Sequence, residues 1–130
     1  MTNLERWHAV VAGKDPDLLD SLLAEDCVFH SPIVHTPQEG KALTKLYLAA
    51  AMQVLTVDGF IYTKEIVDGN QMVLEFSVKN EGIMINGVDI ISFNDAGQIV
   101  EFKVMVRPLK AVNLLHAQMK AMLESMTAAS

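Results

Sequence analysis

The sequence is poor in cysteine and in positive charge, and both shortages narrow the range of functions. Cys27 is the only cysteine among 130 residues, so an internal disulfide and a cysteine-based metal cluster are excluded, and a reducing compartment fits. Lysine and arginine total 10 against 16 aspartate and glutamate residues, which gives a formal net charge of −6. This surplus of negative charge argues against nucleic acid and against an anionic membrane surface as partners.

Long apolar runs are also missing. The longest, from Tyr47 to Leu55, is broken by Gln53 and falls well short of the roughly 20 residues that a membrane-spanning helix needs. The first residues carry Glu5 and Arg6 and no apolar stretch, so we expect no targeting segment. These features predict a cytoplasmic protein without a membrane partner.

The overall composition is that of a globular protein with one core. Apolar types make up 51% of the chain and charged types 20%, a balance that excludes disorder although only 6% of residues are aromatic. A length of 130 residues suits one domain and is too short for two, so we assign residues 1–130 to a single domain.

Helical periodicity dominates the first half of the chain. Apolar residues recur there at spacings of three and four, and Asp15 before Pro16 is a typical helix N-cap. A β-rich segment then ends at Pro32 and leads into a proline-bounded loop. The pattern predicts short helices over about 4–13 and 15–23, a strand over 27–31 and a longer helix over 39–55.

In the second half the period changes from 3.6 to 2, and turn signals at 68–70, 80–82 and 94–97 predict a meander of four strands. Asn86-Gly87 is also a hairpin signal, but a turn there leaves strands of about three residues, so we expect one long strand with a bulge or bend. A terminal amphipathic helix is predicted over about 109–127. The fold class is therefore α+β, with a curved antiparallel sheet wrapped around N-terminal helices and an extra C-terminal helix.

Asp89 is the leading candidate for a functional residue. It shares one face of its predicted strand with Ile85, Ile91 and Phe93, so we expect it to be buried and its pKa to be raised. A carboxylic acid kept neutral in this way can donate a hydrogen bond to a developing oxyanion. The structural alternative is an aspartate paired with a lysine or with backbone amides, an arrangement that also perturbs the pKa.

Other polar side chains are weaker candidates. Trp7 and Tyr47 lie on the apolar faces of their predicted helices, where each either fills the core or offers a donor to a pocket. His35 follows the first strand in a loop from which it can reach a pocket mouth. None of the four histidines stands at metal-ligand spacing, and Ser31 lacks triad partners, so we expect no metal, no cofactor and no nucleophilic serine.

Three segments between Glu5 and Arg107 carry a resemblance to a known superfamily. They are Arg6-Trp7 with Ala12-Gly13, Ser31-Pro32 with Pro37 and Gly40, and the stretch from Asp89 to Ile99. In these segments the sequence resembles the nuclear-transport-factor-two-like proteins, in particular their SnoaL-like and ketosteroid-isomerase-like branches. This resemblance implies a cystatin-like, cone-shaped α+β roll.

The resemblance also implies roles for individual residues. The oxyanion-hole aspartate of the isomerases falls on Asp89, whereas their general-base aspartate is replaced by Ser31 and their oxyanion-hole tyrosine by Trp7. It therefore implies a pocket with one or two hydrogen-bond donors, and which group would act as a base stays open. Pocket-lining positions fall on Phe29, Tyr47, Ile91, Phe102, Val104 and Val106, and the strand alternation adds Phe76.

Two functions follow as hypotheses. One is an isomerase, cyclase or dehydratase that acts on a small hydrophobic carbonyl compound with Asp89 as acid or hydrogen-bond donor. The other is a non-catalytic ligand-binding or dimerisation module. Met105 beside Val73 and Val88 leaves apolar surface on the outer sheet face, so we expect a homodimer. The terminal helix adds Met119, Met122 and Met126 to that argument, and whether it covers its own pocket or the partner subunit stays open.

Overall fold

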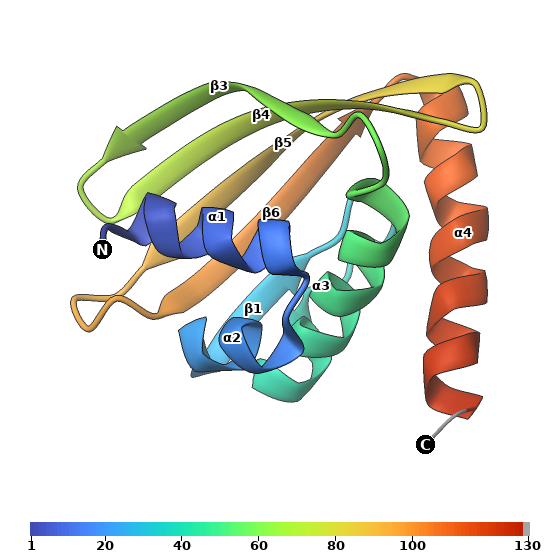
Figure 1. Ribbon diagram of the computed structural model, residues 1–130. Coiled ribbons are helices and arrows are strands. Elements are labelled where there is room, and N and C mark those ends of the chain that lie inside the picture. The colour runs from blue at the N-terminus through green and yellow to red at the C-terminus, as the bar shows by residue number, and fades with distance from the viewer. Residues whose placement is uncertain (129–130) are drawn as a thin grey trace.

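The computed structural model describes residues 1–128 and shows the predicted α+β architecture, a curved sheet with three helices on its concave side and a fourth helix beside them (Figure 1). The helices are α1 (Asn3–Gly13), α2 (Pro16–Leu22), α3 (Lys41–Leu55) and α4 (Leu109–Ala128). The strands are β1 (Leu23–His30), β2 (Gln38–Glu39), β3 (Ile61–Asp68), β4 (Gln71–Asn80), β5 (Ile83–Phe93) and β6 (Ile99–Arg107).

The sheet has the order β2-β1-β6-β5-β4-β3 and is open, because no pairing within residues 1–128 joins β2 to β3. Strands β3 to β6 pair antiparallel, which confirms the predicted meander. β1 and β6 run parallel, so the sheet is mixed, and the expectation of a wholly antiparallel sheet is corrected at this pair. A hairpin imposes antiparallel pairing only on strands that it joins, and β1 and β6 are far apart in the chain.

Side chains satisfy the free backbone N–H groups at the start of the first two helices. The Thr2 hydroxyl accepts a hydrogen bond from the Glu5 backbone at 3.1 Å, and the Glu5 carboxylate accepts one from the Thr2 backbone at 3.2 Å. This capping box was not anticipated from the sequence. Asp15 accepts hydrogen bonds at the start of α2 with Pro16 as the first helical residue, as predicted.

β5 passes through Asn86-Gly87 as one long strand, which confirms that no hairpin forms there. Its register with β4 is unbroken at this point, so a bulge is absent and only the long strand of the prediction holds. A Cβ atom on Gly87 would lie 2.3 Å from the Phe76 ring and 2.9 Å from the Met105 carbonyl oxygen. Glycine is therefore required because the Phe76 ring occupies the space directly above the strand.

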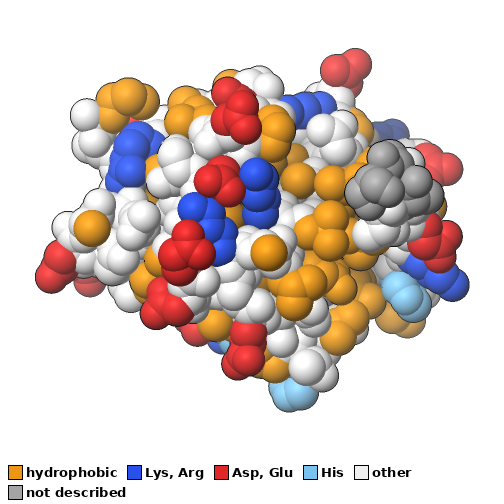
Figure 2. Space-filling view, turned by 90° about the horizontal axis from the view of Figure 1, so that it is seen from below, with side chains coloured by type: hydrophobic (Ala, Val, Ile, Leu, Met, Phe, Trp, Pro, Cys, Tyr) orange, Lys and Arg blue, Asp and Glu red, His pale blue; other side chains and the backbone are white. Residues whose placement is uncertain are grey.

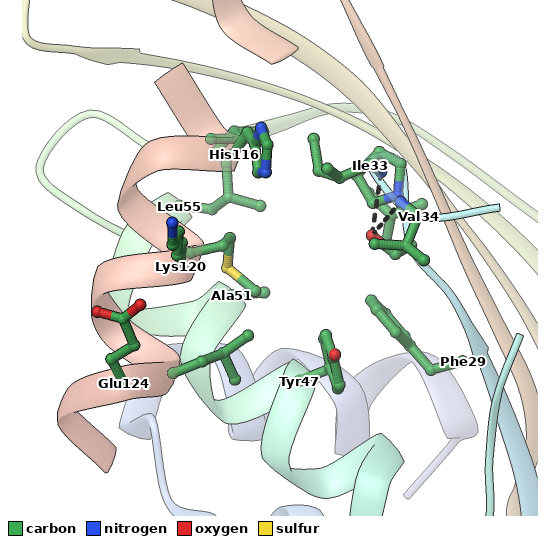
Figure 3. Close-up of a pocket in the computed structure, with 15 residues that line it drawn as sticks. Phe29, Ile33, Val34, Tyr47, Ala51, Leu55, His116, Lys120 and Glu124 are labelled. Atoms are coloured by element: carbon green, nitrogen blue, oxygen red, sulfur yellow. Dashed lines mark hydrogen bonds between the residues drawn. The ribbon is translucent and has the colours of Figure 1, made fainter. Parts of the chain in front are cut away.

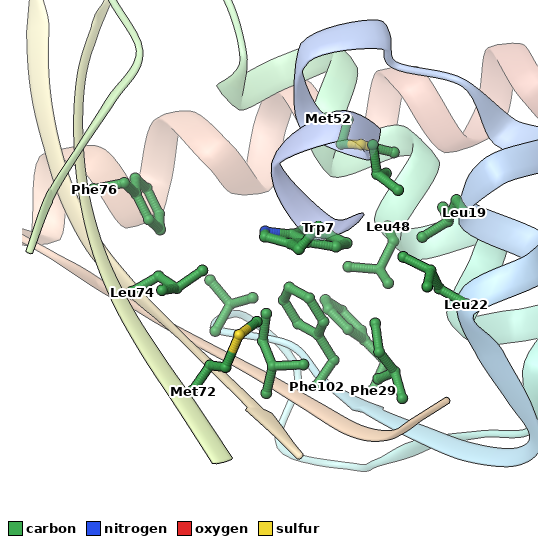
Figure 4. Close-up of a cluster of buried hydrophobic side chains, with 14 of the residues drawn as sticks. Trp7, Leu19, Leu22, Phe29, Leu48, Met52, Met72, Leu74, Phe76 and Phe102 are labelled. Atoms are coloured by element: carbon green, nitrogen blue, oxygen red, sulfur yellow. The ribbon is translucent and has the colours of Figure 1, made fainter. Parts of the chain in front are cut away.

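The concave face of the sheet and the helices enclose the core (Figure 4). The Trp7 ring of α1 packs against Phe102 of β6 with 5.0 Å between ring centroids, and Phe102 lies 6.2 Å from Phe29 of β1. The predicted alternation is confirmed, since the inward positions of β4, β5 and β6 are buried. They include Met72, Leu74, Phe76, Val78, Ile85, Asp89, Ile91, Phe93, Phe102 and Val104.

α4 packs against α3 of its own domain (Figure 1). Met119 and Met122 lie against the chain's own core, and the Asn80 side chain donates hydrogen bonds to Gln118 of α4 at 2.8 Å and to the Val54 carbonyl at the end of α3 at 3.0 Å. These two methionines are thus partly covered by their own domain, and the homodimer stays a prediction. Neither α4 nor any other helix of the described chain has the length and apolar character to cross a membrane.

Candidate functional site

Asp89 lies in the middle of β5, between Leu74 of β4 and Val104 of β6, with its side chain on the concave face. Only 6% of its surface is exposed. Burial raises the pKa of Asp89 to about 7, in spite of a hydrogen bond from Tyr62 that lowers it. A substantial fraction of the molecules therefore carries a neutral Asp89 at neutral pH, as the position among apolar residues predicts.

A chain of two hydrogen bonds leads to this carboxyl group. The Trp7 indole Nε1 donates to the Tyr62 hydroxyl at 2.9 Å, and that hydroxyl donates to Asp89 Oδ2 at 2.8 Å. Burial, and after it the neighbouring Asp89 charge, raises the pKa of Tyr62 far above its ordinary value, so the hydroxyl keeps its proton. Because Asp89 Oδ2 accepts, a neutral Asp89 has its own acid proton left to donate.

Tyr62 is the functional residue that the sequence analysis missed. It lies on β3, whose other side chains are exposed, so the alternation that marks the inner strands is absent. The pairing of β3 with β4 also shifts register between Tyr62 and Lys64. The available signal was the pair of aromatic residues Phe60 and Tyr62, whose rings meet edge to face at 5.1 Å.

The space in front of Asp89 is small. A compartment of about 30 Å³ is lined by Asp89, Tyr62 and Trp7 together with apolar side chains. A volume of this size holds one or two atoms the size of a water molecule. The apolar lining is Val11, Leu48, Ala51, Met52, Leu55, Phe60, Phe76, Phe102 and Val104, with Thr56 as a further polar residue.

A much larger pocket, of about 270 Å³, lies between α3, α4 and the loop that follows β1 (Figure 3). Phe29 and Tyr47 form one side, where their rings stack at 5.8 Å. Ile33 and Val34 of the loop face α4 across the opening (Figure 3). The rest of the lining is Ser31, Pro32, Ala51, Leu55, Val104, Leu115, His116, Met119, Lys120, Leu123 and Glu124.

The two cavities share a wall. Ala51 and Leu55 of α3 and Val104 of β6 line both of them. In the space-filling view, hydrophobic side chains gather on the face beside the C-terminal end of α4, in keeping with a largely apolar pocket lining that reaches the surface (Figure 2). A ligand in the large pocket is therefore separated from Asp89 by three apolar side chains.

The structure brings most of the sequence-predicted site residues to one of these cavities. Phe29, Ser31 and Tyr47 line the large pocket, Trp7, Phe76, Asp89 and Phe102 line the small compartment, and Val104 lines both. Three residues lie elsewhere: Ile91 is in the core, and His35 and Val106 line a separate hollow beside His30.

Ser31 stands on the wall of the large pocket, but its oxygen serves the local backbone. The Ser31 hydroxyl accepts hydrogen bonds from the backbone N–H groups of Ile33 at 3.0 Å and Val34 at 3.3 Å. This turn explains why the chain bends sharply after β1. Within residues 1–128, no three His, Cys, Asp or Glu side chains come together as metal ligands.

Solved structures resemble this fold over nearly its whole length. A steroid Δ-isomerase from Pseudomonas aeruginosa is 36% identical, with a TM-score of 0.90 over 97% of this chain and 92% of that one. A conserved bacterial protein with a cystatin-like fold from Silicibacter pomeroyi is 34% identical, with a TM-score of 0.84 over 92% and 83% of the two chains. A nuclear-transport-factor-two-like protein of unknown function from Mesorhizobium loti, 23% identical over 82% and 88% with a TM-score of 0.70, shares the fold.

The comparison with curated proteins finds no match. The family model of the SnoaL-like domain matches residues 4–102, which span α1 to the first half of β6 and include every residue of the Trp7–Tyr62–Asp89 chain. α4, which forms one wall of the large pocket, lies outside that match. The chain belongs to the SnoaL-like domain family, within the nuclear-transport-factor-two-like and ketosteroid-isomerase-like superfamily.

Proposed function

We propose that the protein binds a small hydrophobic carbonyl compound and acts on it by isomerase-, cyclase- or dehydratase-type chemistry, with Asp89 as the hydrogen-bond donor to the carbonyl oxygen. The observation that carries this proposal is a buried carboxylic acid beside an apolar pocket, with burial raising its pKa to about 7. The steroid Δ-isomerase from Pseudomonas aeruginosa, at 36% identity, supports carbonyl chemistry in this family.

The volumes of the large pocket and of the Asp89 compartment suit different parts of such a ligand. The large pocket, of about 270 Å³, takes the apolar body, and its volume is just below the roughly 300–1,000 Å³ that is usual for ligand pockets. The compartment of about 30 Å³ takes one oxygen atom. Leu55 and Val104 must move aside for that oxygen to reach Asp89, so closure of the apolar wall around the ligand excludes water from the hydrogen bond.

The hydrogen-bond chain prepares Asp89 for this role. Each donor in the series from Trp7 through Tyr62 points toward the carboxyl group, so Tyr62 occupies Oδ2 and leaves the acid proton for the ligand. A donor that is already oriented in a dry site stabilises a developing oxyanion without reorganisation.

The test compares 2-decalone, a bicyclic ketone, with decalin, the hydrocarbon of the same shape. We expect 2-decalone to shift the Asp89 carboxyl ¹³C signal and to raise its pKa, because a hydrogen bond from the neutral acid favours the protonated form. Decalin should fill the pocket without this effect. The exposed carboxyl of Asp26 serves as an internal control. Equal responses to the two compounds, or none to the ketone, contradict the proposal.

A second function is association with another copy of the chain. Met105 is 50% exposed on the outer sheet face and pairs across the strands with Val88. Lys64, Glu75 and Arg107 line the same shallow hollow, so a two-fold arrangement can place acidic against basic groups. We expect a dimer by light scattering at micromolar concentration and a shift to monomer in Met105→Lys. A wild-type mass near 14.3 kDa contradicts this function.

A further inference from the structure

The site described above has an acid but no evident base. Asp89 in its neutral form already carries a proton and its Oδ2 accepts from Tyr62, and the Ser31 hydroxyl is a weak base whose oxygen already accepts two backbone hydrogen bonds. Enolisation of a ketone needs both partners, one to stabilise the oxygen and one to take a proton from the neighbouring carbon. The pocket lining therefore has to supply a second group.

Every charged or imidazole side chain in the lining of the large pocket comes from α4. The β1 loop, α3 and β6 contribute apolar residues, Ser31 and the Tyr47 phenol, whereas α4 contributes His116, Lys120 and Glu124 on successive turns. The Lys120 ammonium has donors only. In Figure 3 the charged ends of Lys120 and Glu124 turn away from the cavity, and the His116 ring lies at its rim across from Ile33.

His116 differs from His8 and His30 in its partners, and it differs from His35 in lining the large pocket. His8 contacts the Glu65 carboxylate and His30 contacts Glu101 at 3.1 Å, so both rings are committed on the surface. Within residues 1–128, neither ring nitrogen of His116 has a hydrogen-bond or ion-pair partner in the fold. An imidazole is the side chain best suited to exchange protons near neutral pH.

We infer that His116 is the proton carrier of this pocket. This inference rests on the proposed function. The neutral imidazole takes a proton from the carbon next to the ligand carbonyl, the C–H electron pair forms the enolate, and the oxygen is held by the Asp89 hydrogen bond. The imidazolium then returns the proton to the same carbon, or to a conjugated one if the ligand is unsaturated. No electron is gained or lost overall, so the step needs no co-reactant.

The experiment follows deuterium uptake at the α-carbons of 2-decalone in D₂O by mass spectrometry. We expect wild type to catalyse the exchange and His116→Ala to lose it by roughly 10² to 10⁴, the usual contribution of a general base. Because His116 is exposed, the variant should fold normally. Matched controls are His35→Ala, which removes a histidine outside both cavities, and Lys110→Gln, at the exposed start of α4 and outside both cavities.

A chemical-rescue arm separates proton transfer from a structural effect. Imidazole added to His116→Ala should restore exchange in proportion to its concentration, and imidazole added to His35→Ala should change nothing. Exchange that is equal in wild type and His116→Ala, or no faster than buffer in wild type, overturns the inference. The Asp89 carboxyl signal shows whether such a failure extends to the proposed function. If the signal still responds to 2-decalone, only the role of His116 is contradicted. If it does not respond, the proposed function and the role of His116 are both contradicted.

Discussion

The large pocket and the Asp89 compartment share the side chains of Ala51, Leu55 and Val104, yet they are opposites in chemistry. The pocket has about 270 Å³ of space and a nearly continuous apolar lining, with its ionisable groups on α4 at the rim. The compartment has about 30 Å³, but its acid is buried and supported by two hydrogen bonds in series. In the proposed function, the pocket supplies affinity and the compartment supplies the hydrogen bond to the carbonyl oxygen.

The difference in volume between the two cavities shows how such a site can hold a buried acid whose charged form is costly to desolvate. A carboxylate in contact with bulk water keeps an ordinary pKa, so the acid needs a compartment too small to hydrate it. The ligand body needs room, and the room lies on the far side of an apolar wall. Each variant below changes one of these two regions, so that its effect on exchange, stability or the pKa of Asp89 can be measured.

The largest effect is expected from adding a base to the large pocket. Ser31→Asp places a carboxylate on the pocket wall, and it can still accept the backbone hydrogen bonds of Ile33 and Val34. In a His116→Ala background, α-proton exchange of 2-decalone should rise by roughly 10² to 10⁴. Ser31→Asn is the control of matched shape without a charge. Equal rates in the two variants would show that Ser31 does not face the bound ketone.

Removing the acid should change the pH dependence of stability. The folded-state pKa of Asp89, about 7, lies above the ordinary value of 3.8, so the native state binds the extra proton between these two pH values. The free energy of unfolding should therefore fall as pH rises from about 4 to about 7, by on the order of 4 kcal/mol from this group.

Asp89→Asn removes this titration and still accepts a hydrogen bond from Tyr62. Urea unfolding at pH 4, 5.5 and 7 should show the variant gaining on wild type with each step. Asp26→Asn, an exposed aspartate, should track wild type throughout. Parallel pH profiles for wild type and Asp89→Asn would mean that Asp89 has an ordinary pKa and that the compartment is wet.

Crowding Phe76, a side chain that lines the compartment, should destabilise the fold. The methyl group of Gly87→Ala would meet the Phe76 ring and the fixed Met105 carbonyl oxygen, so the ring must move. We expect a loss of about 3 kcal/mol in urea unfolding, as for overpacked cores. Gly69, in the β3–β4 turn, has open space around an added Cβ but a positive φ. Gly69→Ala therefore tests backbone conformation without a steric clash. A Gly87→Ala protein as stable as wild type would show that Phe76 is not held in place.

The smallest effect on stability should come from breaking the hydrogen-bond chain. Tyr62→Phe removes the donor to Asp89 and leaves the Trp7 indole N–H without its acceptor, at a cost of about 2 kcal/mol. The pKa of Asp89 should rise further, because the Tyr62 hydrogen bond lowers it. Carboxyl ¹³C titration measures this shift. A pKa that falls in Tyr62→Phe would mean that water enters in place of the hydroxyl.

Local patterns in the sequence predicted the elements of the fold and the position of Asp89 well. Strand alternation depends only on neighbours in the chain, so it placed Phe76, Asp89 and Phe102 on the inner face. The long strand through Gly87 followed from counting the residues on either side of a possible turn. Prolines and glycines marked most of the remaining boundaries to within a few residues, but β1 begins at Leu23, four residues before the predicted strand, and the short β2 was not predicted.

Features that depend on distant parts of the chain were not predicted. The parallel pairing of β1 with β6 joins strands far apart in sequence, and no local period encodes it. Tyr62 lies on a strand without alternation, so its hydrogen bond to Asp89 became visible only with the tertiary structure. His116 was not among the predicted site residues for the same reason, since only the packing of α4 against α3 brings it to the pocket.

Trp7 gives the site an optical property. It is the only tryptophan of the chain, and its indole N–H is hydrogen-bonded to the hydroxyl that in turn holds Asp89. Indole fluorescence from this protein therefore originates at a single position, two hydrogen bonds from the acid. Changes in emission on titration or on addition of a ketone report directly on the compartment, so the occupancy of the site can be followed in the unlabelled wild-type protein.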